Sequence, residues 1–151
     1  MWNGKGYNIN GNFEFEIKNG KGHIKNYYDN GKLKFEGEYL NGEKNGEGKV
    51  YYNDKLEFEG TFLNGKRNGK GKDYNYNGKL VFEGEYLNGK RHGKGKEYYD
   101  NNLIFEGEYL KGKKWNGKGY NKDGHLEFEL KNGCGIIKEY NYKGKLILEG
   151  E

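Results

Sequence analysis

Residues 82–102 read FEGEYLNGKRHGKGKEYYDNN, and their pattern predicts the local structure. Its first part alternates, with Phe82, Gly84 and Tyr86 on one side of an extended strand and glutamates on the other. The Asn-Gly pair that follows is the strongest short hairpin signal, because a type I′ turn needs positive φ at both central residues. The return strand, GKGKEYY, places its glycines where a neighbour's aromatic ring is expected to cover them. The stretch therefore predicts a β-hairpin.

The same hairpin recurs along the chain. FEGEY begins at Phe35, Phe82 and Phe105, and the variant FEGTF begins at Phe58, so the spacings are 23, 24 and 23 residues. A Tyr-rich stretch and a turn precede each copy, and twelve Asn-Gly dipeptides mark turns. A fixed period of this length indicates a repeat protein.

A longer repeat overlies the short one. Residues 2–38 match residues 115–151, so a super-unit of 113 residues is followed by 38 residues of the next. Two short units interrupt the series, and there Phe15 and Phe128 are expected to replace the inner glycine. We expect residues 1–151 to form one repeat array of about six to seven units of 21–24 residues, with no linker and no second domain.

Composition excludes several classes of protein. The chain has 28 Gly and 21 Asn but no Ala, Ser, Gln or Pro, which argues against long helices. Its 15 Tyr, 8 Phe and 2 Trp, together with a net charge of only +4, argue against disorder. No apolar stretch approaches the roughly 18 residues of a spanning helix, and the single Cys134 excludes an internal disulfide framework. A cytoplasmic location, peripheral to a membrane if lipids are bound, is therefore expected.

Stacking follows from the weakness of one unit. A single hairpin is marginal in water, so the units must lie side by side to bury their aromatic face. We expect an all-β fold, an elongated single-layer antiparallel meander of stacked hairpins with about twelve to fourteen strands, twisted or curved. Glutamates of the first strand and lysines of the second are expected to form a chequered charged face, worth about 0–1 kcal/mol per exposed pair.

Residues 82–102 resemble the MORN repeat (membrane occupation and recognition nexus) in three elements: aromatic-x-Gly-x-aromatic, then Asn-Gly, then Gly-x-Gly. YYDNGKL from Tyr27 is similar to the related variant repeat of bacterial proteins. The resemblance covers essentially the whole chain and is most specific at residues 35–110. It implies successive hairpins that form an extended, grooved rod used for protein–protein contacts, dimerisation and scaffolding, and it implies membrane phosphoinositide binding as a further role. In MORN proteins that are enzymes, the catalytic domain is a separate segment.

Catalysis and metal binding find little support in the residues. His23, His92 and His125 occupy repeat positions filled elsewhere by Lys, Asn or other turn residues. A nucleophile could come only from Thr61 or Cys134, since the chain has no serine. Histidine and cysteine show no metal-ligand spacing. We expect no enzymatic activity, no catalytic or metal-binding residues and no cofactor.

The favoured function is a protein-interaction scaffold, with self-association through an aromatic groove as part of it. Tyrosine and tryptophan dominate the residues that carry binding energy at interfaces. The candidate contact residues are Tyr39, Phe62, Tyr86, Tyr109 and Trp115. Many of them are also expected to form the core of the sheet, since core and contact surface overlap in a single-layer array.

Basic loop tips support a different function, binding to anionic membrane lipids. Each Lys or Arg near such a surface contributes roughly 1 kcal/mol. The candidate lipid-binding residues are Lys66, Arg67, Lys90, Arg91, Lys113 and Lys114. Plain solvated loop tips are the alternative, because Glu43 breaks the run and neighbouring glutamates cancel most of the field. Nucleic acid fits poorly, since the net charge is only +4.

The ends of the chain suggest a third possibility. The sequence begins midway through a unit and stops at the start of a FEGEY-like strand, so both ends are expected to expose strand edges. Head-to-tail pairing of such edges would give an open filament or a ring. The alternative is that the chain is a piece of a longer array.

Overall fold

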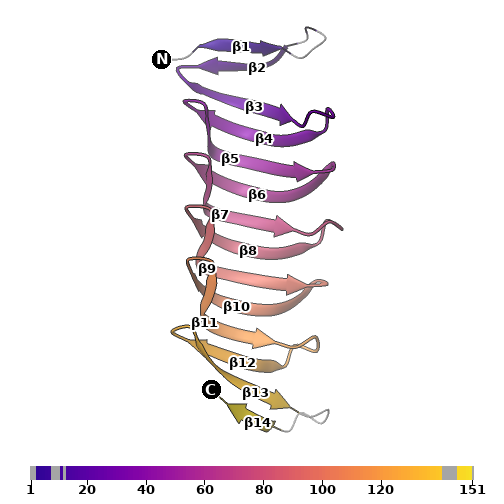
Figure 1. Ribbon diagram of the computed structural model, residues 1–151, viewed down its shortest axis with the longest axis vertical. Helices are drawn as coiled ribbons and strands as arrows, with labels where there is room; N and C mark the ends of the chain where they lie inside the picture. The colour runs from indigo at the N-terminus through magenta and orange to yellow at the C-terminus, as the bar shows by residue number, and fades with distance from the viewer. Residues whose placement is uncertain (1–2, 8–10, 12, 141–145, 151) are drawn as a thin grey trace.

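The computed structural model describes residues 3–7, 11, 13–140 and 146–150. Within these residues, fourteen strands form one antiparallel sheet in sequence order, with β1 and β14 at opposite ends of an unclosed array. Figure 1 shows the strands stacked along one axis into a rod. The predicted all-β meander of stacked hairpins is confirmed.

The strands are β1 (Gly4–Tyr7), β2 (Phe13–Lys18), β3 (Lys21–Tyr27), β4 (Leu33–Leu40), β5 (Glu43–Tyr52), β6 (Lys55–Leu63), β7 (Lys66–Tyr74), β8 (Leu80–Leu87), β9 (Lys90–Tyr99), β10 (Asn102–Leu110), β11 (Lys113–Tyr120), β12 (Leu126–Lys131), β13 (Cys134–Tyr140) and β14 (Leu146–Gly150). The part of the chain that the structure describes contains no helix long and apolar enough to cross a bilayer. The 113-residue repeat reaches into residues 2, 8–10, 12, 141–145 and 151, which lie outside the described residues.

Tight two-residue turns form one long edge of the rod, the turn edge, and their sequence explains their geometry. At Asn88-Gly89 both residues have positive φ, 51° and 82°, which a type I′ turn requires. Between β3 and β12 the opposite edge alternates between five-residue loops and two-residue turns. In the loop after β7, the side-chain oxygen of Asn75 accepts hydrogen bonds from the backbone N–H groups of Asn77 and Lys79. Such a loop lies between Phe58 and Phe82, where the spacing is 24 rather than 23 residues.

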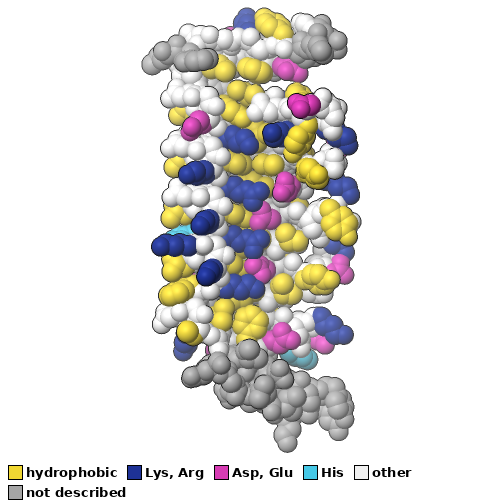
Figure 2. Space-filling view, in the orientation of Figure 1, with side chains coloured by type: hydrophobic (Ala, Val, Ile, Leu, Met, Phe, Trp, Pro, Cys, Tyr) yellow, Lys and Arg dark blue, Asp and Glu magenta, His cyan; other side chains and the backbone are white. Residues whose placement is uncertain are grey.

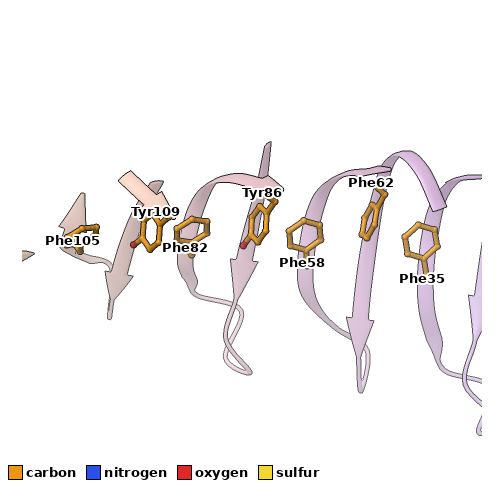
Figure 3. Packing of buried hydrophobic residues seen from close by; sticks show 7 residues of the cluster. All are labelled: Phe35, Phe58, Phe62, Phe82, Tyr86, Phe105 and Tyr109. Carbon is orange, nitrogen blue, oxygen red and sulfur yellow. The ribbon is translucent and has the colours of Figure 1, made fainter. Parts of the chain in front are cut away.

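The core of the rod is one row of aromatic rings, the aromatic row. Its members are Phe35, Phe58, Phe62, Phe82, Tyr86, Phe105 and Tyr109. Each is at most 6 % exposed, and successive rings meet edge to face with centroids 5.2–5.6 Å apart. Figure 3 shows these rings in line along the rod. Edge-to-face pairs contribute about 0.5–1.5 kcal/mol each beyond the area they bury, so the row links every unit to the next.

A row of glycines, the glycine row, makes room for these rings. One glycine from each of β4 to β11 pairs with the next across the sheet, from Gly37 to Gly117. A Cβ added at Gly48 would lie 2.5 Å from Cζ of Phe35, and one added at Gly95 would lie 2.6 Å from Cζ of Phe82. The prediction that the return-strand glycines lie under aromatic rings is therefore confirmed.

The short unit near the C-terminal end corrects one expectation. Phe128 pairs with Gly119, which also pairs with Phe105, so Phe128 occupies the position of the row phenylalanine. The residue at the glycine position is Leu130, which pairs with Gly117. The prediction that Phe128 replaces the inner glycine is wrong.

The first unit has the same arrangement, with Phe15 paired to Gly6 and Ile17 paired to Gly4. The prediction for Phe15 is therefore wrong as well. The physical reason is where these hairpins are shortened. Both lose residues at the turn edge rather than at the aromatic position, so the register of the phenylalanine is kept and an aliphatic side chain takes the place of glycine.

Candidate functional site

Four cations lie on the same face as the aromatic row. They are Lys44, Arg67, Arg91 and Lys114, one from each of β5, β7, β9 and β11, and we call them the cation column. In each hairpin a β-bulge follows the glycine pair, and beyond it the cation pairs with the second aromatic residue. The register shift explains why a residue next to the turn lies over the core instead of pointing into solvent.

Each member of the cation column covers a phenylalanine of the aromatic row. Nζ of Lys44 lies 4.3 Å from the ring centroid of Phe35, and Nζ of Lys114 lies 4.5 Å from that of Phe105. The guanidinium carbons of the two arginines lie 4.1 and 4.0 Å from the rings of Phe58 and Phe82. Figure 2 shows a central column of Lys and Arg side chains running down this face. Such contacts contribute about 0.5–2 kcal/mol each, depending on desolvation.

Two carboxylates bridge the cations. Asp73 accepts from Arg67 at 2.8 Å and from Arg91 at 3.1 Å. Glu97 accepts from Arg91 at 2.8 Å and contacts Nζ of Lys114 at 2.7 Å. The three units are therefore joined by a chain of half-buried ion pairs, in which geometry and partial burial make each pair stronger than an exposed one.

The bridging carboxylates also set the ionisation of their neighbours. Arg91 loses solvation on burial, which lowers its pKa, but the hydrogen bonds and charges of Asp73 and Tyr86 together outweigh that effect and raise the pKa overall. Burial, the hydrogen bond to Asp73 and the charge of Asp73 raise the pKa of Tyr86, whose hydroxyl donates to that carboxylate at 2.5 Å. Both side chains therefore keep their protons at any physiological pH.

The charge balance of the column varies along the rod. Val50 stands at the register position that Asp73 and Glu97 occupy in the next units. The pKa of Lys44 is lowered by burial and by the charges of Lys34 and Arg67. The end of the column nearest the N-terminus therefore carries the least compensated positive charge.

Tyr109 differs from its equivalent, Tyr86. Its hydroxyl is buried and has no hydrogen-bond partner among the described residues. Glu97 stands where Asp73 stands one unit earlier, but both of its oxygens are engaged by Arg91 and Lys114. Burial raises the pKa of Tyr109, and so do the charge of Glu97 and a hydrogen-bonding interaction with that carboxylate, which is too poorly formed to satisfy the hydroxyl.

The residues predicted as contacts of a protein partner are divided by the structure. Phe62, Tyr86 and Tyr109 are buried members of the aromatic row. Tyr39 is half-buried beside the row and accepts a hydrogen bond from the side-chain amide of Asn26 at 2.7 Å. Trp115 is half-buried and lies against the turn at position 133 rather than within the row. Only Tyr39 and Trp115 thus keep substantial surface for a partner.

The residues predicted to bind lipid are divided in a similar way. Arg67, Arg91 and Lys114 are half-buried in the cation column, whereas Lys66, Lys90 and Lys113 are exposed at the turn edge. The structure thus places the residues predicted to contact a protein and those predicted to bind lipid next to each other, because both groups border the face that carries the aromatic row. Sequence reasoning missed Lys44, Asp73 and Glu97. Lys44 could have been found from its alignment with Arg67, and the two acids from their position after Gly-Lys-Gly-Lys.

Exposed leucines lie next to the turn-edge lysines. Leu63 pairs with Lys66, Leu87 with Lys90 and Leu110 with Lys113 at the ends of their hairpins. These leucines are 48 %, 45 % and 36 % exposed. The turn edge is therefore both apolar and basic.

The chemistry available here is binding. Within the described ranges, no group of three or more His, Cys, Asp or Glu side chains is placed to hold a metal ion. Cations fixed at regular intervals over a rigid aromatic row can attract and orient anionic groups.

Comparisons with known proteins agree with the hairpin repeat. The model of the MORN repeat matches residues 35–56, 58–72 and 82–104, and that of the MORN repeat variant matches residues 20–41 and 67–88. Together these matches cover more than half of the chain. A search of curated proteins finds no match.

Proposed function

Because the chain belongs to the MORN repeat family, a non-enzymatic type of repeat that commonly binds proteins or membranes, we propose that it is an interaction scaffold. Its partner is an elongated, acidic segment of another protein, which lies along the cation column and the turn edge. The observation that carries this proposal is the cation column itself, fixed over the aromatic row at one cation per unit.

Charge is distributed unevenly over the molecule. The four turn segments, residues 40–44, 63–67, 87–91 and 110–114, contain eight cations and one carboxylate. Counting Asp73 and Glu97 with them leaves an excess of five positive charges, which is larger than the net charge of +4 for the whole chain. The remainder of the protein is therefore slightly negative, and the positive potential is concentrated on this edge and face.

The spacing of the cations determines the shape of partner that fits. Equivalent residues of successive units are two strands apart, or about 9.6 Å along the rod. One exposed ion pair contributes only about 0–1 kcal/mol, so a single acidic side chain would bind weakly. A segment that presents carboxylates to several units at once adds these contributions, and its affinity falls as salt rises.

A glutamate-rich peptide labelled with a fluorophore provides the probe. Its binding is measured by anisotropy against the native protein and against the triple variant Lys66→Glu, Lys90→Glu, Lys113→Glu. This variant spares the half-buried cations that stabilise the fold. The proposal expects binding by the native protein and loss of at least tenfold in affinity, about 1.4 kcal/mol, in the variant.

The matched control makes the same change in charge on the opposite face, with Lys49→Glu, Lys72→Glu and Lys96→Glu. At about 0.15 M salt the Debye length is near 8 Å, so reversal on the far face should change affinity little. Equal losses in the two variants would mean that only net charge matters and that the cation column is not the binding site.

A membrane surface is the second candidate, and the exposed leucines beside the turn-edge lysines favour it. Leucines at the tips of hairpins can enter the interfacial region while neighbouring lysines contact anionic head groups. Co-sedimentation with phosphoinositide vesicles tests this function. The variant Leu63→Asn, Leu87→Asn, Leu110→Asn should lose vesicle binding and keep peptide binding. A native protein that stays in the supernatant would remove the membrane role.

A further inference from the structure

A ladder of alternating charge, the charge ladder, crosses the face opposite the aromatic row. It runs from Lys25 in β3 to Glu129 in β12, one residue per strand, in direct register. Every odd-numbered strand supplies a lysine and every even-numbered strand a glutamate. The ladder residues of β4 to β11 follow or precede the glycines whose missing Cβ would point at the rings, so their side chains project to the other face.

This face is hollowed. A groove of about 1140 Å³ runs over β4 to β11, with the glycine row along its floor and charged side chains on either side. The ladder lysines are exposed, whereas the glutamates are half-buried. Tyr74 and Tyr98 donate hydrogen bonds to Glu59 and Glu83, which fixes those carboxylates. The face thus presents half-buried carboxylates that alternate with exposed lysines, three of which form ion pairs with the neighbouring glutamate of the same chain.

The alternation makes the ladder complementary to itself. The ladder occupies β3 to β12, an even number of strands, so reading it in reverse exchanges every lysine for a glutamate. A two-fold axis parallel to the strands, placed between β7 and β8, brings each strand of one copy opposite the strand of opposite charge in the other. Lys72 then faces Glu83 of the second copy, and Lys25 faces its Glu129. All positions of the ladder are matched.

The charged residues across the groove from the charge ladder limit how far along the rod the two copies have complementary charges. Under the same axis Lys70 in β7 faces Glu85 of the second copy, which adds a favourable pair at the centre. Further out, Glu47 faces Glu108, and these like charges oppose each other. Twisted sheets also diverge as they extend from a crossing point. Contact is therefore strongest at β7 and β8.

We propose that the glycine-floored face binds a second copy of this chain, antiparallel and face to face, through the charge ladder. Lysine stems of one copy lie over the glycine floor of the other, where the aliphatic carbons are covered and the ammonium groups reach carboxylates. An interface this rich in Lys and Glu is weak and sensitive to salt. The dimer uses the face opposite the cation column, so the test of the dimer and the test of the proposed function can fail separately.

Sedimentation velocity across a concentration series tests the dimer. The native protein should dimerise at about 0.05 M NaCl and dissociate at about 0.5 M. Lys72→Glu creates two symmetric contacts between glutamates, and Glu83→Lys creates two between lysines. Each variant alone should dimerise at least about tenfold more weakly, because like charges across an interface oppose association. An equimolar mixture of the two restores both pairs and should recover the native dimer.

Lys90→Glu, on the turn edge, is the control for net charge and should dimerise like the native protein. Circular dichroism confirms that each variant is folded, and the mixing arm shows that a loss in either single variant is not misfolding. A native protein that is monomeric at every concentration in low salt would overturn the proposal. A mixture no more associated than its components would also overturn it.

Discussion

The glycine row gives the sharpest test of how this chain stabilises itself. Gly95 lies in β9 with a backbone that any residue can adopt, so Gly95→Ala introduces no φ strain. The new methyl group would lie 2.6 Å from Cε2 and Cζ of Phe82 and 3.1 Å from Cε2 of Tyr109. Ordinary contacts of this kind are longer by about 1 Å. The rings must therefore move or the sheet must open.

Neither movement is easy at this position. Phe82 is fully buried, meets Tyr86 and Tyr109 edge to face, and lies under the guanidinium of Arg91. Overpacking of a filled core costs about 1–3 kcal/mol. Replacing a strand glycine by alanine returns about 0.5–1 kcal/mol through the unfolded state. Taking the middle of each range, the net expectation is a loss of about 1 kcal/mol in the free energy of unfolding.

Urea denaturation followed by far-UV circular dichroism measures this loss. Gly4→Ala is the matched control, because Gly4 also lies in a strand, lacks positive φ and has no atom within 4 Å of its added Cβ. The control should be neutral or slightly more stable. Gly95→Ala combined with Phe82→Leu should cost less than the sum of the single changes, since the smaller side chain leaves room. If Gly95→Ala is as stable as the native protein, the claim that rings fill the space over the glycines is refuted.

Three further comparisons test the aromatic row and the hydrogen bonds of the tyrosine hydroxyls. Tyr86→Phe removes a hydrogen bond to a carboxylate and should lower the free energy of unfolding by about 1.5–3 kcal/mol, whereas Tyr109→Phe removes a hydroxyl whose interaction with Glu97 falls short of a full hydrogen bond and should cost less; equal losses in urea denaturation would contradict this. Phe58→Ala should cost about 3–5 kcal/mol and Tyr52→Ala, at a site 62 % exposed, less than about 0.5. The pKa of Tyr98 is raised from 10.0 to about 12, so its contribution to stability is complete below pH 10 and is lost as pH rises toward 12. An absorbance titration should show that Tyr98→Phe lacks one tyrosine that ionises at high pH in the native protein. If the tyrosine lost from the titration has the ordinary pKa near 10, the assignment is contradicted.

Much of the architecture follows from local sequence. Asn-Gly turns, alternating glutamates and the Gly-x-Gly return strand specify each hairpin, and the fixed period specifies the stack. The glycine-under-ring packing could be predicted because glycine in a strand leaves a gap that an aromatic neighbour can cover. The alternation of Lys and Glu on the far face also followed, since strands have a side-chain period of two.

The face that we propose for binding could not be predicted from the sequence in the same way. A bulge after the glycine pair shifts the register, and period-two reasoning cannot anticipate that Arg67 and Arg91 therefore lie over Phe58 and Phe82. The prediction for the short units was wrong for a related reason. Sequence alignment placed Phe128 on the inner glycine, but its position in the sheet is fixed by cross-strand pairing with Gly119.

All the proposed surfaces exist only if the sheet is open and extended in solution, and small-angle X-ray scattering of the monomer tests that claim most directly. Fourteen strands at about 4.8 Å spacing give a rod roughly 62 Å long, for which the radius of gyration is about 20 Å. A compact chain of the same 151 residues would have a radius of gyration near 15 Å. Data collected in about 0.5 M salt, where the proposed dimer dissociates, should give the larger value. A value near 15 Å would contradict the account.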